Sequence, residues 1–230
     1  MKIAGLQKLT LLDYPQHTAC TVFLHGCNYR CPFCHNAGLV TLPAEDEIST
    51  DTLFSFLKKR QGLLDGVCIS GGEPTLNPEL PDFMREIRSL GYQVKLDTNG
   101  TNPQMLRSLC AEGLLDMVAM DIKNAPEKYP LTAGTQQAHI DKINESVRFL
   151  LSDVVPYEFR TTIVKGYHTP ADMVSIGKWI AGAKAYYLQA FLDSGQLIAE
   201  GLCGCTKEEM ETLRDAVLPY VKNTHLRGID

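Results

Sequence analysis

Short apolar runs alternate along the chain with longer stretches of helical periodicity. Six of these runs are rich in Val, Ile, Leu or aromatic residues, which is typical of strands buried on both faces of a parallel sheet. The intervening stretches are long enough for the helices that connect parallel strands. The predicted strands are Ala19–Leu24, Gly66–Ser70, Gln93–Asp97, Met117–Ile122, Tyr157–Val164 and Ala185–Phe191.

Local signals mark where several of the connecting helices begin and end. A polar residue before proline predicts an N-cap with proline at the first helical position, and glycine predicts a C-terminal stop. A Thr with Glu three residues later predicts a capping box. Starts are predicted at Asn77-Pro78, Asn102-Pro103, Thr169-Pro170 and Thr206, and ends at Gly91, Gly113 and about Val221.

Six strand–helix units define the predicted fold class, which is α/β with a parallel sheet. A closed (β/α)8 barrel needs eight units and about 250 residues, whereas this chain has 230. An open partial (β/α)6 barrel is therefore expected, with an open doubly wound sheet as the other arrangement. We expect a single domain over 1–230, with a flap or hairpin at 1–18, the six units at 19–191, and a segment and helix at 192–230.

Composition narrows the function classes. With 44% hydrophobic residues and a net charge of -5, the chain can bury a core and has no basic excess for nucleic acid. No apolar run reaches the roughly 20 residues of a membrane span, and the N-terminus lacks a secretory signal pattern. We expect no nucleic-acid or membrane partner and a reducing, cytoplasmic location, where clustered cysteines favour metal over disulfide.

Three of the 8 cysteines, Cys27, Cys31 and Cys34, lie in one short window directly after the first strand. A [4Fe–4S] cube takes one ligand per iron, so three thiolates would leave one iron open for chemistry. Zinc is the alternative, with His35 as a fourth ligand, although structural zinc sites commonly use two C-x2-C pairs. The other cysteines are expected to pack as ordinary side chains; they are Cys20, Cys68, Cys110, Cys203 and Cys205. This holds even for Cys203 and Cys205, although a C-x-C pair could bind a metal.

Polar motifs also follow the next strands, at the edge where parallel strands place functional sites. Ser70–Pro74 contains two glycines that let the backbone approach a ligand closely. Asp97–Gly100 ends the third strand, and Asp121 and Lys123 end the fourth on one side of it. Taken singly, these are ordinary turns and an ordinary salt bridge, but chance is a poor explanation for their common location.

Two further polar residues lie within predicted strands, and the sequence leaves the first of them open. Arg160 either faces the interior, where it needs an anionic partner, or faces solvent at a sheet edge. Gln189 is more simply a satisfied core amide.

These motifs resemble those of the radical S-adenosylmethionine (SAM) enzymes. The cysteine window matches their C-x3-C-x-aromatic-C signature, with Phe33 as the aromatic residue, and Gly71–Pro74 matches their GGEP motif. Three other segments narrow the resemblance to the activating proteins of glycyl radical enzymes, in particular the short form for anaerobic ribonucleoside-triphosphate reductase. These segments are Gly5–Pro15, Asp97–Gly100 and Met120–Lys123.

The resemblance implies a mechanism and a set of roles. Cys27, Cys31 and Cys34 would hold three irons of a [4Fe–4S] cluster, and SAM would chelate the fourth. One electron from the reduced cluster would cleave SAM to methionine and a 5′-deoxyadenosyl radical, which abstracts hydrogen from the substrate. The residues implied to bind SAM are Phe33 near the adenine, the backbone of Gly71, Gly72, Glu73 and Pro74 at the methionyl amino group, and Asn99 and Lys123 at the ribose or carboxylate end.

The same resemblance implies further partners. In some of these activating proteins, residues matching Asp97, Thr98 and Asp121 hold a monovalent cation beside the SAM carboxylate. A glycyl radical enzyme would be the protein substrate, and a low-potential donor such as flavodoxin or ferredoxin would reduce the cluster.

The short chain bears on the substrate, because six units leave a barrel open at the side. A loop of a partner enzyme could supply the missing wall and present a glycine Cα–H. Two alternatives stay open. One is a radical SAM enzyme that acts on a small molecule, like the deazapurine synthases. The other is an iron–sulfur electron-transfer protein with Cys20 or Cys203 as the fourth cluster ligand.

Overall fold

The computed structural model describes residues 1–42, 48–193, 195 and 197–229. Its described strands form one sheet in the order β1-β2-β3-β4-β5-β6-β7-β8. The strands are β1 (Ile3–Thr10), β2 (Ala19–Leu24), β3 (Gly66–Gly71), β4 (Gln93–Thr98), β5 (Met117–Asp121), β6 (Tyr157–Ile163), β7 (Tyr186–Ala190) and β8 (Thr224–Arg227).

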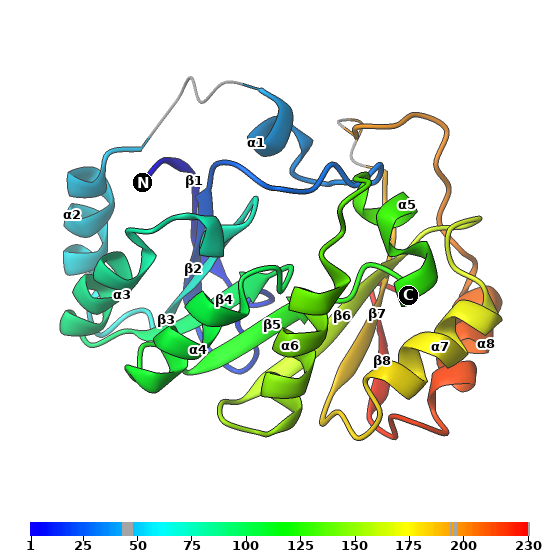
Figure 1. The fold of residues 1–230 in the computed structure, drawn as a ribbon. Helices are drawn as coiled ribbons and strands as arrows, with labels where there is room; N and C mark the ends of the chain where they lie inside the picture. The colour runs from blue at the N-terminus through cyan, green and yellow to red at the C-terminus, as the bar shows by residue number, and fades with distance from the viewer. Residues whose placement is uncertain (43–47, 194, 196, 230) are drawn as a thin grey trace.

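Helices lie along the outside of the curved sheet (Figure 1). The α-helices are α1 (Ala37–Thr41), α2 (Thr50–Arg60), α3 (Leu80–Ser89), α4 (Pro103–Ala111), α5 (Tyr129–Ala133), α6 (Ile140–Leu151), α7 (Pro170–Trp179) and α8 (Lys207–Val217). Two 3-10 helices, η1 (Pro74–Leu76) and η2 (Pro126–Lys128), follow β3 and β5. The sheet is an open, partial barrel, as predicted, because among the strands of the described residues β1 pairs only with β2 and β8 only with β7.

The six predicted strands correspond to β2–β7 and agree with them to within one residue at each end. Each pairs in parallel with the next, so their carboxyl ends lie along one edge of the sheet. The apolar runs located them because strands buried on both faces carry apolar side chains almost continuously.

Two helix boundaries differ from the prediction. Asn77-Pro78 does not start a helix, because the chain first forms η1 and α3 begins at Leu80. The last helix ends at Val217 rather than near Val221. Pro219 has no N–H with which to continue the helical hydrogen bonds.

The two terminal segments add strands to the sheet. Residues 1–18, expected as a flap or hairpin, include β1, which pairs antiparallel with β2. Beyond β1, Tyr14 is buried and its ring occupies the space where a side chain on Gly66 would lie. At the other end, β8 follows α8 and was not predicted. With four residues, β8 is too short and too polar to form a recognisable apolar run.

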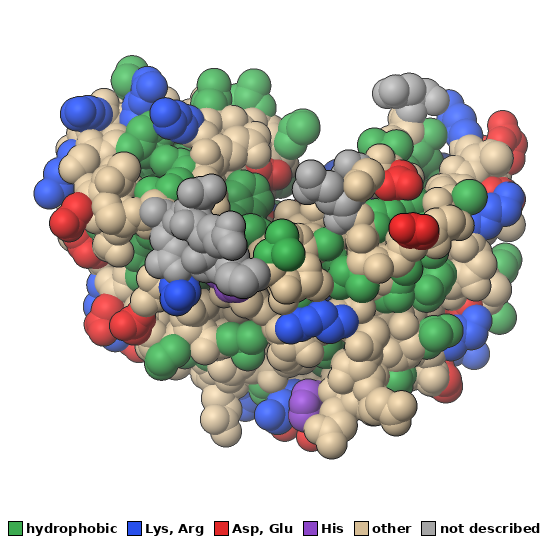
Figure 2. Space-filling view, turned by 90° about the horizontal axis from the view of Figure 1, so that it is seen from above, with side chains coloured by type: hydrophobic (Ala, Val, Ile, Leu, Met, Phe, Trp, Pro, Cys, Tyr) green, Lys and Arg blue, Asp and Glu red, His purple; other side chains and the backbone are tan. Residues whose placement is uncertain are grey.

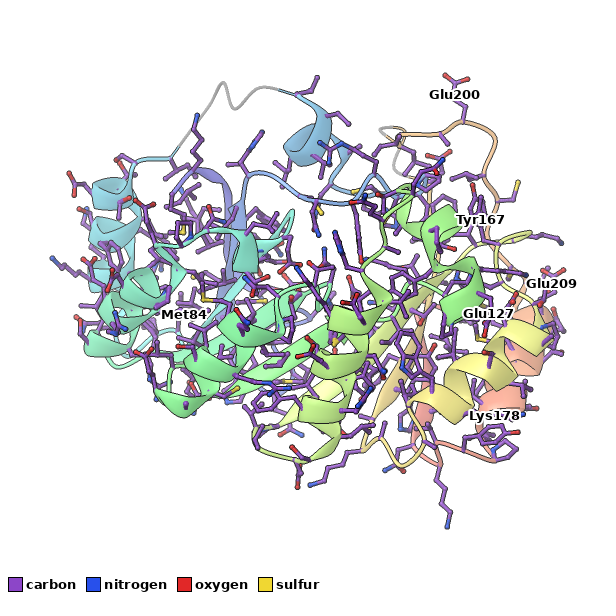
Figure 3. The ribbon with its side chains drawn as sticks, viewed as in Figure 1. Met84, Glu127, Tyr167, Lys178, Glu200 and Glu209 are labelled. Carbon is purple, nitrogen blue, oxygen red and sulfur yellow. The ribbon has the colours of Figure 1, made fainter. Side chains whose placement is uncertain are left out.

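The main core lies between the sheet and the outer helices, as Met84 on α3 illustrates in Figure 3. A smaller apolar cluster of Phe33, Val164 and Phe191 lies apart from this core, and Tyr167 packs against it. A search of the described residues finds no helix both long and apolar enough to cross a membrane.

We expect Thr169→Ala to lower the free energy of unfolding by about 1 kcal/mol. Thr169 caps α7, because its hydroxyl accepts from the Asp172 backbone N–H while the Asp172 carboxylate accepts from the Thr169 N–H. Urea unfolding would measure the change. Thr212→Ala is the control, because Thr212 is exposed within α8 and alanine favours a helix interior. An equal loss in both variants would contradict the role assigned to the cap.

Candidate active site

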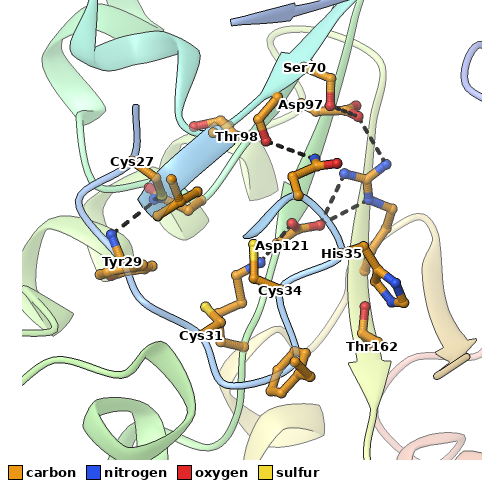
Figure 4. Close-up of a pocket in the computed structure, with 18 of the residues that line it drawn as sticks. Cys27, Tyr29, Cys31, Cys34, His35, Ser70, Asp97, Thr98, Asp121 and Thr162 are labelled. Carbon is orange, nitrogen blue, oxygen red and sulfur yellow. Dashed lines mark hydrogen bonds and ion pairs between the residues drawn. The ribbon is translucent and has the colours of Figure 1, made fainter. Parts of the chain in front are cut away.

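A cavity of about 350 Å³ lies at the carboxyl ends of the strands (Figure 4). It brings together residues that are far apart in the sequence. The predicted site residues that line it are Cys27, Cys31, Phe33, Cys34, Gly71, Gly72, Asp97, Thr98, Asn99, Asp121 and Lys123. Glu73 and Pro74 are not among the described lining residues, and both are buried.

The loop that carries the three cysteines is held by other parts of the chain. The Arg30 N–H donates to the Ala133 carbonyl at the end of α5 (2.9 Å). The Tyr29 hydroxyl donates to the Ala138 carbonyl (2.7 Å). On the other side of the loop, the Ala199 N–H donates to the Pro32 carbonyl (2.9 Å). The cysteines are therefore positioned by segments from the second half of the chain.

The thiols lie in surroundings that disfavour the free thiolate. Burial raises the pKa of Cys27 to about 11 and also raises that of Cys31. Two features act in the opposite direction: the Tyr29 N–H donates to the Cys27 sulfur (3.3 Å), and the Lys123 charge lowers the pKa of Cys31. A metal that bound here would therefore displace protons from buried thiols.

The two glycines after β3 are needed for close packing against the cysteine loop. Gly71 has a φ of +113°, a conformation that favours glycine. A Cβ on Gly72 would lie 2.0 Å from the Gly26 carbonyl oxygen, directly before the first cysteine. The Gly72 N–H in turn donates to the Leu24 carbonyl (2.9 Å). The GGEP turn and the cysteine loop thus touch through their backbones.

Glu73 holds the ends of two strands together. Its carboxylate accepts hydrogen bonds from the hydroxyl and N–H of Thr75, from the Thr98 hydroxyl (2.8 Å) and from the Asn99 N–H (2.6 Å). Burial raises the pKa of Glu73, and these donors oppose the rise. The Glu73 side chain is therefore structural in this conformation.

Asn99 connects the end of β4 to the cysteine loop. Its amide nitrogen donates to the Asn28 side-chain oxygen (2.8 Å), and its oxygen accepts from the N–H and hydroxyl of Thr101. Asn28 also donates to the Thr101 hydroxyl (3.0 Å). No sequence pattern pointed to Asn28, because its position beside Asn99 depends on the folded loop.

Side chains of opposite charge form a network of ion pairs at the cavity. Arg160 bonds to Asp121 through Nε and an amino group (both 3.0 Å) and lies 3.4 Å from Asp97. Lys95 pairs with the other oxygen of Asp97 (2.5 Å). Lys123 pairs with the other oxygen of Asp121 (2.9 Å), which is the salt bridge considered from the sequence.

The pKa directions agree with these ion pairs. Burial acts to raise the pKa of Asp121, but Lys123 and Arg160 outweigh it and hold this pKa at about 2. The pKa of Asp97 is lowered, because Arg160 and Lys95 outweigh burial. The pKa values of Arg160 and Lys123 are raised by their carboxylate partners despite burial. All four groups are charged at neutral pH.

The structure decides the orientation of Arg160, which the sequence left open, and corrects the prediction for Gln189. Arg160 faces the interior, with two anionic partners. Gln189 lines the cavity rather than packing as a core amide. Lys95 was missed, although it lies two residues before Asp97 and so shares its face of β4. A lysine within an otherwise apolar strand was the available signal.

The remaining cysteines lie away from the cavity. Cys20 and Cys68 are buried, Cys110 is half-buried and Cys203 is exposed, and none of these lines the cavity among the described residues. No three His, Cys, Asp or Glu side chains in the described part of the chain are placed to hold a single metal ion. Cluster cysteines bind different irons, so they need not converge on one point.

The family model for the radical SAM superfamily matches residues 21–166. The chain belongs to this superfamily and is an enzyme of the radical SAM class. A protein of Methanocaldococcus jannaschii, provisionally named a glycyl-radical enzyme activating enzyme, is 32% identical over 99% of this chain and 96% of its own length. The pyruvate formate-lyase-activating enzyme of Clostridium pasteurianum is 28% identical over 64% of this chain and 63% of its own. The predicted resemblance to such activating enzymes is confirmed.

Solved structures support the fold. Streptococcus suis SuiB bound to S-adenosylmethionine superimposes with a TM-score of 0.68 at 12% identity, over 90% of this chain and 52% of that one. At this identity the likeness concerns the arrangement of strands and helices alone.

We expect Gly72→Ala to lower the free energy of unfolding by about 1–3 kcal/mol, as overpacking typically does, because the new methyl group would displace the Gly26 carbonyl. Urea unfolding would test this. Gly38→Ala in α1 is the matched control, since only Leu42 lies near the added methyl group, at 3.8 Å. It should be neutral or stabilise the protein by roughly 0.5–1 kcal/mol. Similar losses in both variants would contradict the close contact.

Proposed function

We propose that this protein uses a [4Fe–4S] cluster and SAM to place a glycyl radical on a partner enzyme. One observation carries the proposal. Cys27, Cys31 and Cys34 line the same cavity as the glycine turn and Lys123. The relative from Methanocaldococcus jannaschii, which is named as an activating enzyme, matches this chain over 99% of its length.

The residues present fit both cofactors. Three thiols face one cavity, and the described lining offers no fourth cysteine, so a cube held there would keep one iron for SAM. When bound, the reduced cluster supplies one electron that splits a sulfonium C–S bond of SAM, and the freed adenosyl carbon takes a hydrogen atom from the substrate. The reaction also requires that water be kept away from the carbon radical, and the protein would provide this exclusion.

The chain's own side chains give each part of SAM a partner. Lys123 is the proposed counter-charge for the carboxylate, and its ion pair with Asp121 fixes its position. Gly71 and Gly72 line the cavity, and their backbone is the proposed partner of the methionyl amino group. Phe33 offers an apolar surface for the adenine and packs edge-on against Tyr167, at 6.0 Å between ring centroids.

The size of the cavity favours a substrate that stays mostly outside it. Pockets for drug-sized ligands measure about 300–1,000 Å³, and this one lies near the lower limit at about 350 Å³. SAM alone would fill most of it. A partner loop that inserts only a glycine needs little further space, whereas a second small molecule would need a pocket of its own.

Exposed apolar side chains lie in the connections around the cavity. Leu42, Leu131, Leu192 and Ile198 follow strands β2, β5 and β7 at their carboxyl ends and are exposed. Figure 2 views the molecule from above, towards this edge, and shows apolar atoms on both sides of an indentation. Exposed apolar groups of this kind are typical of protein-binding surfaces, which supports a protein substrate.

Anaerobic ribonucleoside-triphosphate reductase is the proposed partner, on the motif resemblance. The relative named for pyruvate formate-lyase makes that enzyme the second candidate. Flavodoxin or ferredoxin is the proposed electron donor.

Electron paramagnetic resonance would test this function. The reconstituted protein, SAM and a reductant would be mixed anaerobically with each candidate partner, and a glycyl radical is expected on one of them. Deuterium on the target glycine should appear in 5′-deoxyadenosine. A partner variant with alanine at that glycine is the control. Release of 5′-deoxyadenosine that depends on a small molecule, with no radical on any partner, would overturn the proposal in favour of the small-molecule alternative.

We expect Cys31→Ala to abolish cluster binding and SAM cleavage, because the cube would lose one of its three protein ligands. Iron content, the visible absorption of the cluster and 5′-deoxyadenosine release would measure this. Cys110→Ala is the control, since Cys110 lies in α4 away from the cavity, and it should retain all three. A Cys31→Ala protein that kept its cluster would refute the ligand assignment.

A further inference from the structure

The three residues expected to hold a monovalent cation already have other partners. Asp97 offers one oxygen to Lys95 (2.5 Å) and the other to the Ser70 hydroxyl (3.0 Å) and to Arg160. Both oxygens of Asp121 are bonded, one to Arg160 and one to Lys123. Each oxygen that would coordinate a hard cation therefore faces a nitrogen or a hydroxyl donor.

Thr98, the third expected ligand, is directed elsewhere. Its hydroxyl donates to the Glu73 carboxylate (2.8 Å) and accepts from the Gly100 N–H (3.1 Å). Both hydrogen bonds of the hydroxyl are therefore made within the structure around the end of β4. The side chains at this place do not fit a monovalent cation.

The charge balance points the same way. Two carboxylates, Asp97 and Asp121, face three cationic groups, Lys95, Arg160 and Lys123. Both carboxylates of this network are thus already paired with cationic side chains before any metal binds, and a further cation would meet those charges at short range. Beyond these direct charged partners of Asp97 and Asp121, Asp13 also lines the cavity and Glu158 also acts on Arg160.

Lys95 is the unusual member of this network. Its side chain is 1% exposed, compared with 20% for Lys123, so it cannot reach a ligand in the cavity. Besides Asp97, its ammonium contacts the Cys68 sulfur (3.8 Å). A buried ammonium without direct access to the ligand can act only through the carboxylate that it neutralises.

We propose that the Lys95 ammonium takes the place of the monovalent cation, so that this protein binds SAM without Na⁺ or K⁺. Lys95 neutralises Asp97, which leaves Arg160 free to hold Asp121, and Asp121 in turn positions Lys123. Lys95 is thus a positioning residue. The inference rests on the proposed SAM site.

Calorimetric titration of the cluster-loaded protein with SAM is the test. The titration is run at constant ionic strength in potassium, sodium or tetramethylammonium chloride, since tetramethylammonium is too large to be coordinated by the carboxylates. The dissociation constant of the wild-type protein should change less than about twofold among the salts. A tenfold or greater gain of affinity in potassium or sodium would overturn the inference, and this arm needs no variant.

Lys95→Met gives the second arm. The variant keeps an unbranched side chain without the charge, and it should bind SAM at least about tenfold more weakly in tetramethylammonium. Such a loss supports the inference, whether or not Na⁺ or K⁺ restores the affinity. Unchanged affinity would overturn it. Lys58→Met, at an exposed position on α2, is the matched control, and circular dichroism would check that both variants fold.

The two proposals fail in different ways. If the cluster-loaded wild-type protein binds no SAM in any salt, the proposed function and this inference both fall. If SAM binds only with Na⁺ or K⁺, the proposed function stands and the role of Lys95 does not.

Discussion

The buried carboxylate of Glu73 is the interaction on which the site depends most. A carboxylate removed from water is very unfavourable unless hydrogen bonds replace its hydration, and here four donors from Thr75, Thr98 and Asn99 do so. These donors come from the turn after β3 and from the end of β4. Asn99 extends the connection to Asn28 in the cysteine loop. This buried carboxyl group, with Asn99, thus fixes the relative positions of three segments that surround the cavity.

The strands and the cysteine loop could be predicted from sequence because their signals are local. An apolar run marks a buried strand wherever it occurs, and the cysteine spacing needs no knowledge of the fold. The Asn102 cap, the start of α7 at Thr169-Pro170 and the capping box of α8 were likewise predicted and formed. The start of α3 was wrong because an Asn-Pro pair also suits the turn that follows a 3-10 helix.

The charge network could not be predicted in the same way. Arg160 lies on β6 and its partners lie at the ends of β4 and β5, so its role appears only when the parallel strands are brought into register. Lys95 depends on the same register. Strand β8 was missed for a similar reason. Its Arg227 forms an ion pair with Glu158 on β6, and no local sequence pattern predicts this pairing.

The attachment of the cysteine loop has a consequence for how the protein is made. The three proposed cluster ligands lie at residues 27–34, but some of the backbone groups that hold the loop belong to Ala133 and Ala199. At about 5–20 residues per second, synthesis leaves roughly 10–30 seconds between emergence of the three thiols and emergence of their last support. During this interval the thiols have no finished binding site. Delivery of iron and sulfide to the proposed cluster site would therefore follow the exit of most of the chain from the ribosome.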